Sequence, residues 1–240
     1  MTRSANPYFR FKQFTVYHDR CAMKVGTDGV LLGAWADVRN CKTILDVGSG
    51  SGLIALMAAQ RSDATIDGVE IDKDAWLQSL ENINHSDYKE RITIYHVPFS
   101  DYCVQTDKKY DLIISNPPYF SRSLLPSDNK RQLARHSTGL SLNELISGCS
   151  LLLNTAGKAA FILPVSAEPN LIESAKKHDL HILRKTKVKP TPTSNPKRLL
   201  IELGKEKSDY EENELIIEIE RHVYSEEYRL LTKDFYKSKK

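Results

Sequence analysis

Cysteine is scarce in this chain of 240 residues, and long apolar runs are missing from it. The four cysteines are far apart and show no paired C-x-x-C spacing: Cys21, Cys41, Cys103 and Cys149. This spacing argues against a zinc site or a disulfide framework and favours a reducing compartment. No apolar run reaches the roughly eighteen residues of a membrane span. Residues 1–10 are polar and lack the apolar core of an export signal, so we expect a cytoplasmic protein without a membrane partner.

An excess of either charge is also missing, because 34 basic residues stand against 31 acidic ones. The resulting net charge of +3 does not by itself indicate a polyanionic partner. The acidic residues cluster over 206–220, whereas basic groups occur at 185–189, 197–198 and 233–240. This distribution permits a local phosphate-binding face, although solvated charge is the simpler interpretation.

Short apolar runs alternate with helical patterns from Thr43 onward, over a length that fits one domain. The runs are continuous in Leu, Ile and Val, which is typical of a sheet covered on both faces. Strands separated by helices predict an α/β fold with a doubly wound, mostly parallel sheet, closed by an antiparallel strand or two at the C-terminal end. We expect strands at 43–47, 64–70, 91–97, 110–115, 158–163, 180–189, 198–203 and 214–219, and helices at 53–60, 73–84, 142–153 and 169–177.

Two segments do not fit this alternation. Residues 120–140 are polar and follow a strand directly, which is typical of a lid or binding loop. Residues 187–197 carry three prolines between strands and are expected to form an exposed, extended connection.

The strongest local motif is DVGSGSG over 46–52, between a strand and a helix. Its glycines permit positive φ and close approach of a ligand to the backbone. Glu70 ends the next strand about twenty residues on, where a carboxylate can bind a ribose diol. A packing turn with a helix-capping Asp72 is the alternative. Asp46 would repel a pyrophosphate but attract an ammonium group, which favours S-adenosylmethionine over a dinucleotide.

A second motif, NPPY over 116–119, follows a buried strand at the sheet edge where such folds bind ligands. An exocyclic amine of a base is a poor nucleophile because its lone pair is delocalised. The side-chain oxygen of Asn116 and the carbonyl of Pro117, held extended by Pro118, can accept its two hydrogens and direct the lone pair. Tyr119 offers a face for base stacking. A simple turn is the alternative.

These motifs resemble known enzymes. ILDVGSGSG, GVEID and NPPY together resemble the amino-methyltransferase branch of class I methyltransferases. The upstream segment FKQFTVYHDRCAMKVGTDGVLLGAW, over 11–35, resembles the N-terminal segment of bacterial tRNA(Val) adenine-N6 methyltransferases. The resemblance implies a Rossmann-like fold with a seven-stranded sheet. It divides the chain into an N-terminal extension and cofactor lid, 1–40, and a methyltransferase domain, 41–240.

The resemblance also implies a set of cofactor contacts. It assigns Asp46, Gly48 and Gly50 to the methionine moiety and Glu70, with Ile71 beside it, to the ribose. It assigns the flap over the methionine end to Lys24, Gly26, Thr27 and Asp28.

The residue types of the flap also favour cofactor binding without the resemblance. Gly26 permits a turn, Thr27 or Asp28 can cap a helix over 29–36, and free N–H groups at its start suit a carboxylate. A plain capped helix is the alternative.

One stretch departs from the related enzymes, which usually have an acid near the end of the third strand to hold the adenine amine. Here that stretch is His96-Val97-Pro98-Phe99. Proline cannot replace the acid, and Phe99 is left to offer a backbone N–H or its ring.

The NPPY motif specifies an sp² nitrogen acceptor but not the macromolecule that carries it. The leading hypothesis, which rests on the resemblance, is transfer to N6 of adenosine-37, 3′ of the anticodon of a tRNA for valine. No metal and no obligate protein partner is expected. Tyr119 and a set of basic residues are the candidate RNA contacts: Arg122, Lys130, Arg131, Arg135, His136, Lys197 and Arg198.

Other functions remain open. A glutamine-N5 methyltransferase would need a substrate-binding domain, for which about forty residues before the first sheet strand leave no room. A DNA methyltransferase would need a target-recognition domain, and none is evident. An RNA-binding protein without activity would not need Asn116, and an NAD-dependent oxidoreductase would leave NPPY unexplained.

Overall fold

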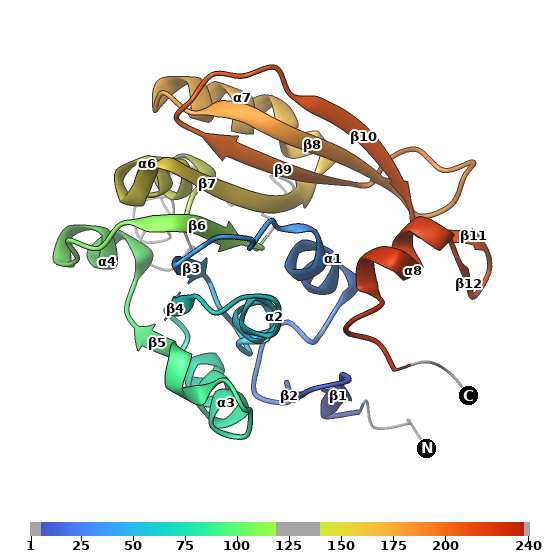
Figure 1. Cartoon of the computed structure of the whole chain (residues 1–240), viewed down its shortest axis with the longest axis horizontal. Coiled ribbons are helices and arrows are strands. Elements are labelled where there is room, and N and C mark those ends of the chain that lie inside the picture. Colours follow the sequence, from blue (N-terminus) through green and yellow to red (C-terminus); the bar gives the residue numbers. More distant parts are fainter. Residues whose placement is uncertain (1–5, 119–139, 238–240) are drawn as a thin grey trace, which may run out of the picture.

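The predicted motifs follow three strands of one central sheet, β3, β4 and β6, in a computed structural model that describes residues 6–118 and 140–237 (Figure 1). The central sheet has eight strands in the order β10-β8-β9-β7-β6-β3-β4-β5. Their bounds are β3 Thr43–Val47, β4 Thr65–Glu70, β5 Ile92–His96, β6 Tyr110–Ser115, β7 Leu153–Pro164, β8 His181–Lys189, β9 Arg198–Gly204 and β10 Glu211–Ile216.

Two further pairs of short strands lie outside this sheet. They are β1 Tyr8–Arg10 with β2 Thr15–Tyr17, and β11 Glu218–Glu220 with β12 Val223–Tyr224. The described helices are α1 Thr27–Trp35, α2 Leu53–Arg61, α3 Lys73–Asn84, α4 Phe99–Gln105, α6 Leu142–Leu152, α7 Glu168–Lys177 and α8 Glu226–Thr232, with short 3-10 turns η1 Lys89–Arg91 and η4 Val165–Ala167.

The predicted doubly wound, mostly parallel sheet is confirmed. β3 pairs in parallel with β4 and β6, and β9 is the antiparallel strand, between β7 and β8. The sheet has eight strands, as the eight predicted runs indicate, so the count of seven that the resemblance implied is wrong. The run predicted at 214–219 overlaps β10, which lies at the edge, parallel to β8. Ion pairs hold it there: Glu212 lies 2.8 Å from Lys185, and Glu214 lies 3.0 Å from Lys189.

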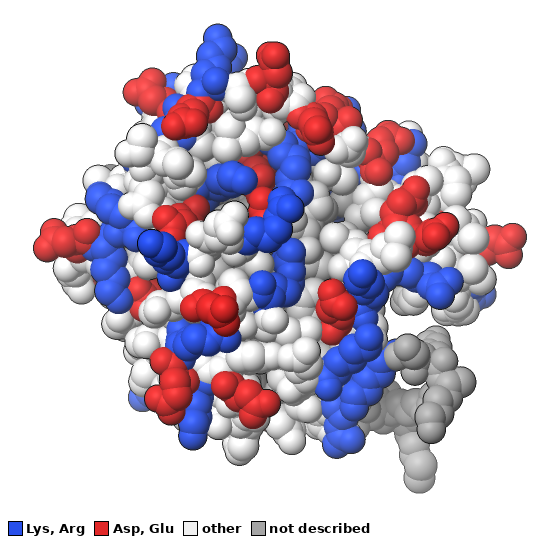
Figure 2. Space-filling model, viewed as in Figure 1, with Lys and Arg blue, Asp and Glu red and all other residues white. Residues whose placement is uncertain are grey.

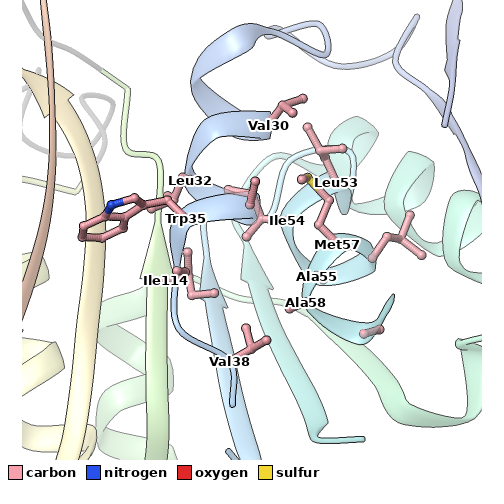
Figure 3. Packing of buried hydrophobic residues seen from close by; sticks show 14 of the residues in the cluster. Val30, Leu32, Trp35, Val38, Leu53, Ile54, Ala55, Met57, Ala58 and Ile114 are labelled. Atoms are coloured by element: carbon pink, nitrogen blue, oxygen red, sulfur yellow. The ribbon is translucent and has the colours of Figure 1, made fainter. Parts of the chain in front are cut away.

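Alternate residues of each central strand point to opposite faces of the sheet, and each face is covered by its own helices. On β6, Leu112 and Ile114 join the core beneath α1 and α2, whereas Ile113 joins the core beneath α4, α6 and α7. Figure 3 shows the first of these cores, where side chains of α1 and α2 meet above Ile114. Gly33 lets the two helices approach closely, because a Cβ there would lie 2.6 Å from the sulfur of Met57.

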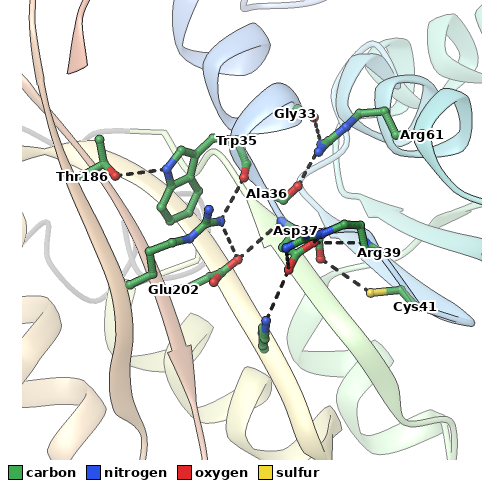
Figure 4. A network of polar contacts seen from close by, with 11 residues as sticks. Gly33, Trp35, Ala36, Asp37, Arg39, Cys41, Arg61, Thr186 and Glu202 are labelled. Carbon is green, nitrogen blue, oxygen red and sulfur yellow. Dashed lines mark hydrogen bonds and ion pairs between the residues drawn. The ribbon is translucent and has the colours of Figure 1, made fainter. Parts of the chain in front are cut away.

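A network of polar contacts holds the C-terminal end of α1 in place (Figure 4). The guanidinium of Arg61 donates 2.8 Å hydrogen bonds to the carbonyls of Gly33 and Ala36, where α1 ends and its last carbonyls need partners. Arg184 stacks at 3.7 Å over the ring of Trp35 and donates to Glu202 at 2.9 Å. The network therefore orients α1, whose other end reaches the candidate site.

The two ends of the described chain pack together beside α1. Phe11, 1% exposed, joins the same core as Phe235 and Tyr228 of the C-terminal segment. The amide of Lys12 donates to the carbonyl of Phe235 at 2.9 Å. Within the described residues no helix is long and apolar enough to span a membrane.

Loss of the Arg61 guanidinium should destabilise the protein. Arg61→Met leaves two carbonyls at the end of α1 without their charged donor, and we expect the free energy of unfolding to fall by about 2 kcal/mol. Urea denaturation followed by circular dichroism measures this change. Arg39→Met is the control, because that exposed guanidinium bonds only Asp37. An unchanged midpoint for Arg61→Met would contradict the capping role.

Candidate active site

Three neighbouring strands end level with one another at the carboxyl edge of the sheet. Val47 of β3 pairs with Val69 of β4 on one side and with Ser115 of β6 on the other. The residues that follow are Gly48, Glu70 and Asn116, so the register brings the three predicted motifs to one place. Neighbouring strands lie about 4.8 Å apart, which sets the scale of the site.

The glycine turn folds against the end of β4. The amides of Gly48 and Ser49 donate to the carbonyl of Val69 at 2.9 and 3.1 Å. Gly48 and Gly50 have φ of +73° and +54°, and a Cβ on either would meet no atom within 4 Å. These glycines therefore satisfy the backbone conformation and leave open space over the turn, as a ligand-binding turn requires.

Glu70 links the turn to α3. One carboxylate oxygen accepts from the amide of Gly50 at 2.8 Å and the other from the amide of Asp72 at 2.9 Å. Asp72 caps α3 by accepting from Ala75, so the capping role weighed as an alternative is real and coexists with the turn. Ile71, between the two acids, is 64% exposed, an apolar surface beside the place expected for the cofactor ribose.

Asp46 carries the strongest electrostatic signal of the site. Asp46 is 1% exposed; Oδ2 accepts from the amide of Ala55 at 3.2 Å, while Oδ1 has no hydrogen-bond partner among the described residues. Burial raises the pKa of this carboxyl to about 7, the bond from Ala55 opposes the shift, and the charge of Glu70 adds to it. A buried carboxylate with an orphaned oxygen is a site for a cation, and a ligand ammonium is the fitting group.

The start of α1 lies at the carboxyl edge of the sheet, but Asp28 makes a different contact there from the helix cap that we predicted. We expected Thr27 or Asp28 to cap a helix beginning at Gly29. Instead α1 begins at Thr27 after Gly26, with no side-chain cap. Asp28 accepts a 2.7 Å bond from Arg198, because the antiparallel pairing of β9 with β7 brings Arg198 to this edge.

The predicted flap residues before α1 and at its start are open to solvent. Lys24, Gly26 and Thr27 are exposed there. Burial, together with the nearby charges of Glu70 and Asp72, raises the pKa of the Cys21 thiol to about 11. The thiol therefore stays protonated at neutral pH.

The sequence analysis did not identify Asn82, which anchors the N-terminal segment through hydrogen bonds to Tyr17. Asn82 of α3 is 1% exposed; its amide oxygen accepts from the backbone of Tyr17 at 2.8 Å. Its amide nitrogen donates to the carbonyls of Tyr17 at 2.8 Å and Ser51 at 2.9 Å. The signal was a polar residue on the buried face of α3, in step with Gln78, Ser79 and Ile83.

The end of β5 contains no acid, as the sequence indicated. His96 stacks on Trp76, with ring centroids 5.1 Å apart, and its Nε2 lies 3.1 Å from the carbonyl of Ile71. Phe99 is the first residue of α4, and its ring is buried against Gly148 of α6. Its backbone N–H, at the start of the helix, is then the group that faces outward from that core.

The NPPY residues are only partly described. Asn116 and Pro117 are half-buried and Pro118 is exposed, directly after β6. Tyr119 lies outside the described residues, as do Arg122, Lys130, Arg131, Arg135 and His136. Lys197 immediately precedes β9 and Arg198 is its first residue, at the same carboxyl edge, where the amide of Val165 donates to the carbonyl of Lys197 at 3.4 Å. Over 6–118 and 140–237, no group of three or more His, Cys, Asp or Glu could hold a metal ion.

The fold, the glycine turn and the acid that ends β4 define a class I methyltransferase, an enzyme whose methyl donor is S-adenosylmethionine. The fold is shared with solved structures of low sequence identity. A predicted O-methyltransferase from Agrobacterium tumefaciens superposes with a TM-score of 0.69 at 18% identity, covering 87% of this chain and 96% of that one. A ribosomal protein L11 methylase from Lactobacillus delbrueckii gives 0.53 at 18% identity, covering 75% and 77%.

Comparison with sequence relatives identifies the family of this chain. Residues 24–140 match the methyltransferase small domain family. Proteins named tRNA1(Val) (adenine(37)-N6)-methyltransferase are 53% identical in Parabacteroides distasonis and 48% identical in Christiangramia forsetii, each covering 97% of this chain and 98% of the relative. The chain therefore belongs to the tRNA1(Val) (adenine(37)-N6)-methyltransferase family, as the sequence resemblance indicated.

The residues at the sheet edge fit the donor. Asp46, with its orphaned Oδ1, suits the methionine ammonium. The open glycine turn permits close approach of the amino-acid end, and Glu70 stands where the ribose is expected.

The titration of Asp46 should govern donor affinity. The ionised carboxylate is the form that attracts an ammonium, so affinity should fall as pH is lowered through about 7. Well below that pKa, the loss approaches about tenfold per pH unit. Isothermal titration between pH 5.5 and 8.5 measures this slope, and Asp46→Asn should bind weakly with a flat profile. A wild-type affinity independent of pH would contradict the assignment.

Proposed function

We propose that this protein transfers the methyl group of S-adenosylmethionine to N6 of adenosine 37 in tRNA1(Val). The observation that carries the proposal is the register of β3 and β6, which sets Asn116 beside the glycine turn. Membership of a family whose named relatives carry this activity supports the choice of acceptor. The lid formed within residues 1–40 and the sheet formed within 41–240 act as one unit in this proposal.

When bound, the donor supplies a cationic sulfonium whose methyl group is the electrophile. The protein's part is to position the acceptor. The side-chain oxygen of Asn116 and the carbonyl of Pro117 accept hydrogen bonds from the exocyclic amine, which turns the nitrogen lone pair out of conjugation and toward the methyl group. Positioning of this kind supplies much of the rate enhancement, and no general base is needed before transfer. The methylated amine then loses its proton to solvent.

The target base must leave its stack to reach this edge, which costs less from an anticodon loop than from a duplex. Tyr119 stacks on the extruded base in this proposal. Lys197, exposed at the start of β9, and the basic residues of 120–140 contact the flanking phosphates. Arg198, paired with Asp28, acts instead by holding the start of α1 against the sheet edge.

Removal of the Asn116 carboxamide should abolish turnover without loss of donor binding. For Asn116→Ala we expect the rate at saturating substrates to fall at least about 100-fold, as for removal of other positioned hydrogen-bonding groups. The measurement is mass analysis of nucleosides from purified tRNA1(Val) after incubation, with donor Kd measured in parallel. Asn84→Ala, an exposed amide at the end of α3, is the matched control.

Substrate identity is tested in the same assay. Parallel incubations with total RNA, DNA and protein separate adenine methylation of RNA from the alternatives. Methylated glutamine or methylated DNA with unmodified tRNA would overturn the proposed function, and so would a near-normal rate for Asn116→Ala.

Substitution of Tyr119 tests base capture. Tyr119→Ala should lower kcat/KM for tRNA by about tenfold or more, because stacking of one base is worth about 1–3 kcal/mol. Tyr119→Phe keeps the ring and should retain most of the activity. Steady-state kinetics with tRNA as the varied substrate distinguish the two. Equal losses in both variants would assign the effect to the hydroxyl and remove stacking from the mechanism.

A further inference from the structure

A groove of about 1190 Å³ runs beside the lid, between the N-terminal strands and the C-terminal segment. One wall contains β1 and the start of α1, including Gly26 and Thr27. The opposite wall contains α8 and the turn between β11 and β12. Gly26 and Thr27 belong to the predicted flap, but the basic residues of the groove have no part in the transfer mechanism.

The groove is strongly basic. Its lining carries five basic side chains and one acidic one, Glu226. The basic residues are all exposed: Arg10, Lys12, Arg229, Lys233 and Lys237. Among the described residues none of these five forms an ion pair with a carboxylate, whereas Lys185, Lys187 and Lys189 on the sheet edge are all paired with acids. Figure 2 shows Lys and Arg side chains gathered over α8 and β1.

Exposed aromatic rings accompany these charges. Phe9 is 36% exposed and Tyr224 is 43% exposed, and both line the groove. Unpaired basic groups interleaved with exposed rings are typical of a surface that binds a nucleic acid backbone and its unstacked bases. An acidic protein surface would use the charges but not the open rings.

The groove adjoins a second pocket near the carboxyl edge of the sheet. A smaller pocket of about 430 Å³ shares Thr27, Tyr224 and Tyr236 with the groove and is lined on its other side by Asp28, Lys197 and Arg198. Lys197 and Arg198 lie at the carboxyl edge of the sheet, where β9 begins. The pocket also contains Glu218, and Arg198 is paired with Asp28, so Lys197 is the basic group that this pocket adds to those of the groove.

We propose that this groove binds the sugar-phosphate backbone of the substrate tRNA outside the target loop. The inference rests on the proposed function and adds a second contact surface, formed jointly by the two ends of the chain. The surface supplies affinity and orientation and reads no sequence, because its charged groups are phosphate ligands. Its effect is therefore expected in the KM for tRNA and in the salt dependence of binding, with kcat unchanged.

The test replaces three groove residues together: Arg10→Gln, Arg229→Gln and Lys237→Gln. The matched control removes the same charge at Lys89, Lys176 and Lys207, which are exposed and lie toward the amino-terminal edge of the sheet. Binding of purified tRNA1(Val) is measured by fluorescence anisotropy between 50 and about 300 mM salt, a range over which phosphate contacts change affinity strongly. Methyl transfer kinetics and donor Kd are measured on the same preparations, and thermal unfolding confirms that each variant is folded.

For the groove variant we expect KM for tRNA to rise about tenfold or more, and the slope of log Kd against log salt to become shallower by about 2 to 3. The kcat and the donor Kd should match those of the control variant. If the groove variant binds tRNA with the wild-type affinity and salt slope while both proteins methylate it, the groove proposal is wrong and the proposed function stands. If the wild-type protein binds tRNA but methylates another substrate class, the proposed function is wrong, and the binding comparison decides the groove separately.

Discussion

Backbone hydrogen bonding between β3 and its two neighbours determines where every functional group of this protein lies. Because the pairing is parallel, the three strands end at one edge, and the loops that follow them start side by side. A shift of one residue in either pairing would turn the side chains of β4 or β6 to the opposite face and separate the motifs. The two apolar cores fix this register, since alternate residues of each strand are buried under different helices.

The site is held together from outside the sheet by polar contacts of three kinds. Glu70 bonds the glycine turn to the start of α3. Asn82 bonds that turn to the N-terminal segment, and the Asp28–Arg198 pair bonds α1 to β9. Each contact joins segments that are distant in the sequence, so the N-terminal segment, the turn and the C-terminal half of the sheet form a connected frame at the candidate active site.

The sequence was sufficient for the parts of the fold that repeat a strong pattern. Runs such as 43–47 and 110–115 predict buried strands, and the glycine turn and NPPY identify their carboxyl ends without coordinates. The short elements β1, β2, α4 and α8 were not predicted, because three to seven residues carry too little periodicity to distinguish them from loops. The eighth strand, β10, is acidic and mostly exposed, and its place depends on lysines of β8 rather than on its own apolar pattern.

Contacts of individual side chains were harder to predict than the elements themselves. Asp28 looked like a helix cap because the residue type suits one, yet Arg198, 170 residues away, takes the carboxylate. Asn82 was passed over because a polar residue in a helix is usually exposed, and only the fold reveals that it faces the turn. In both cases the partner is set by the packing of elements that are distant in the sequence, which spacing along the chain does not encode.

The isolated oxygen of Asp46 has a consequence for the protein before any ligand arrives. A carboxyl whose pKa is higher in the folded state than in the unfolded chain favours folding only while it is protonated. Its contribution to stability is therefore lost as pH rises from about 4 to about 7. At neutral pH the empty enzyme carries part of this cost, and an incoming cation relieves it. Donor binding and the stability of the fold are thus coupled at Asp46, because a cation that pairs with its carboxylate stabilises the folded state.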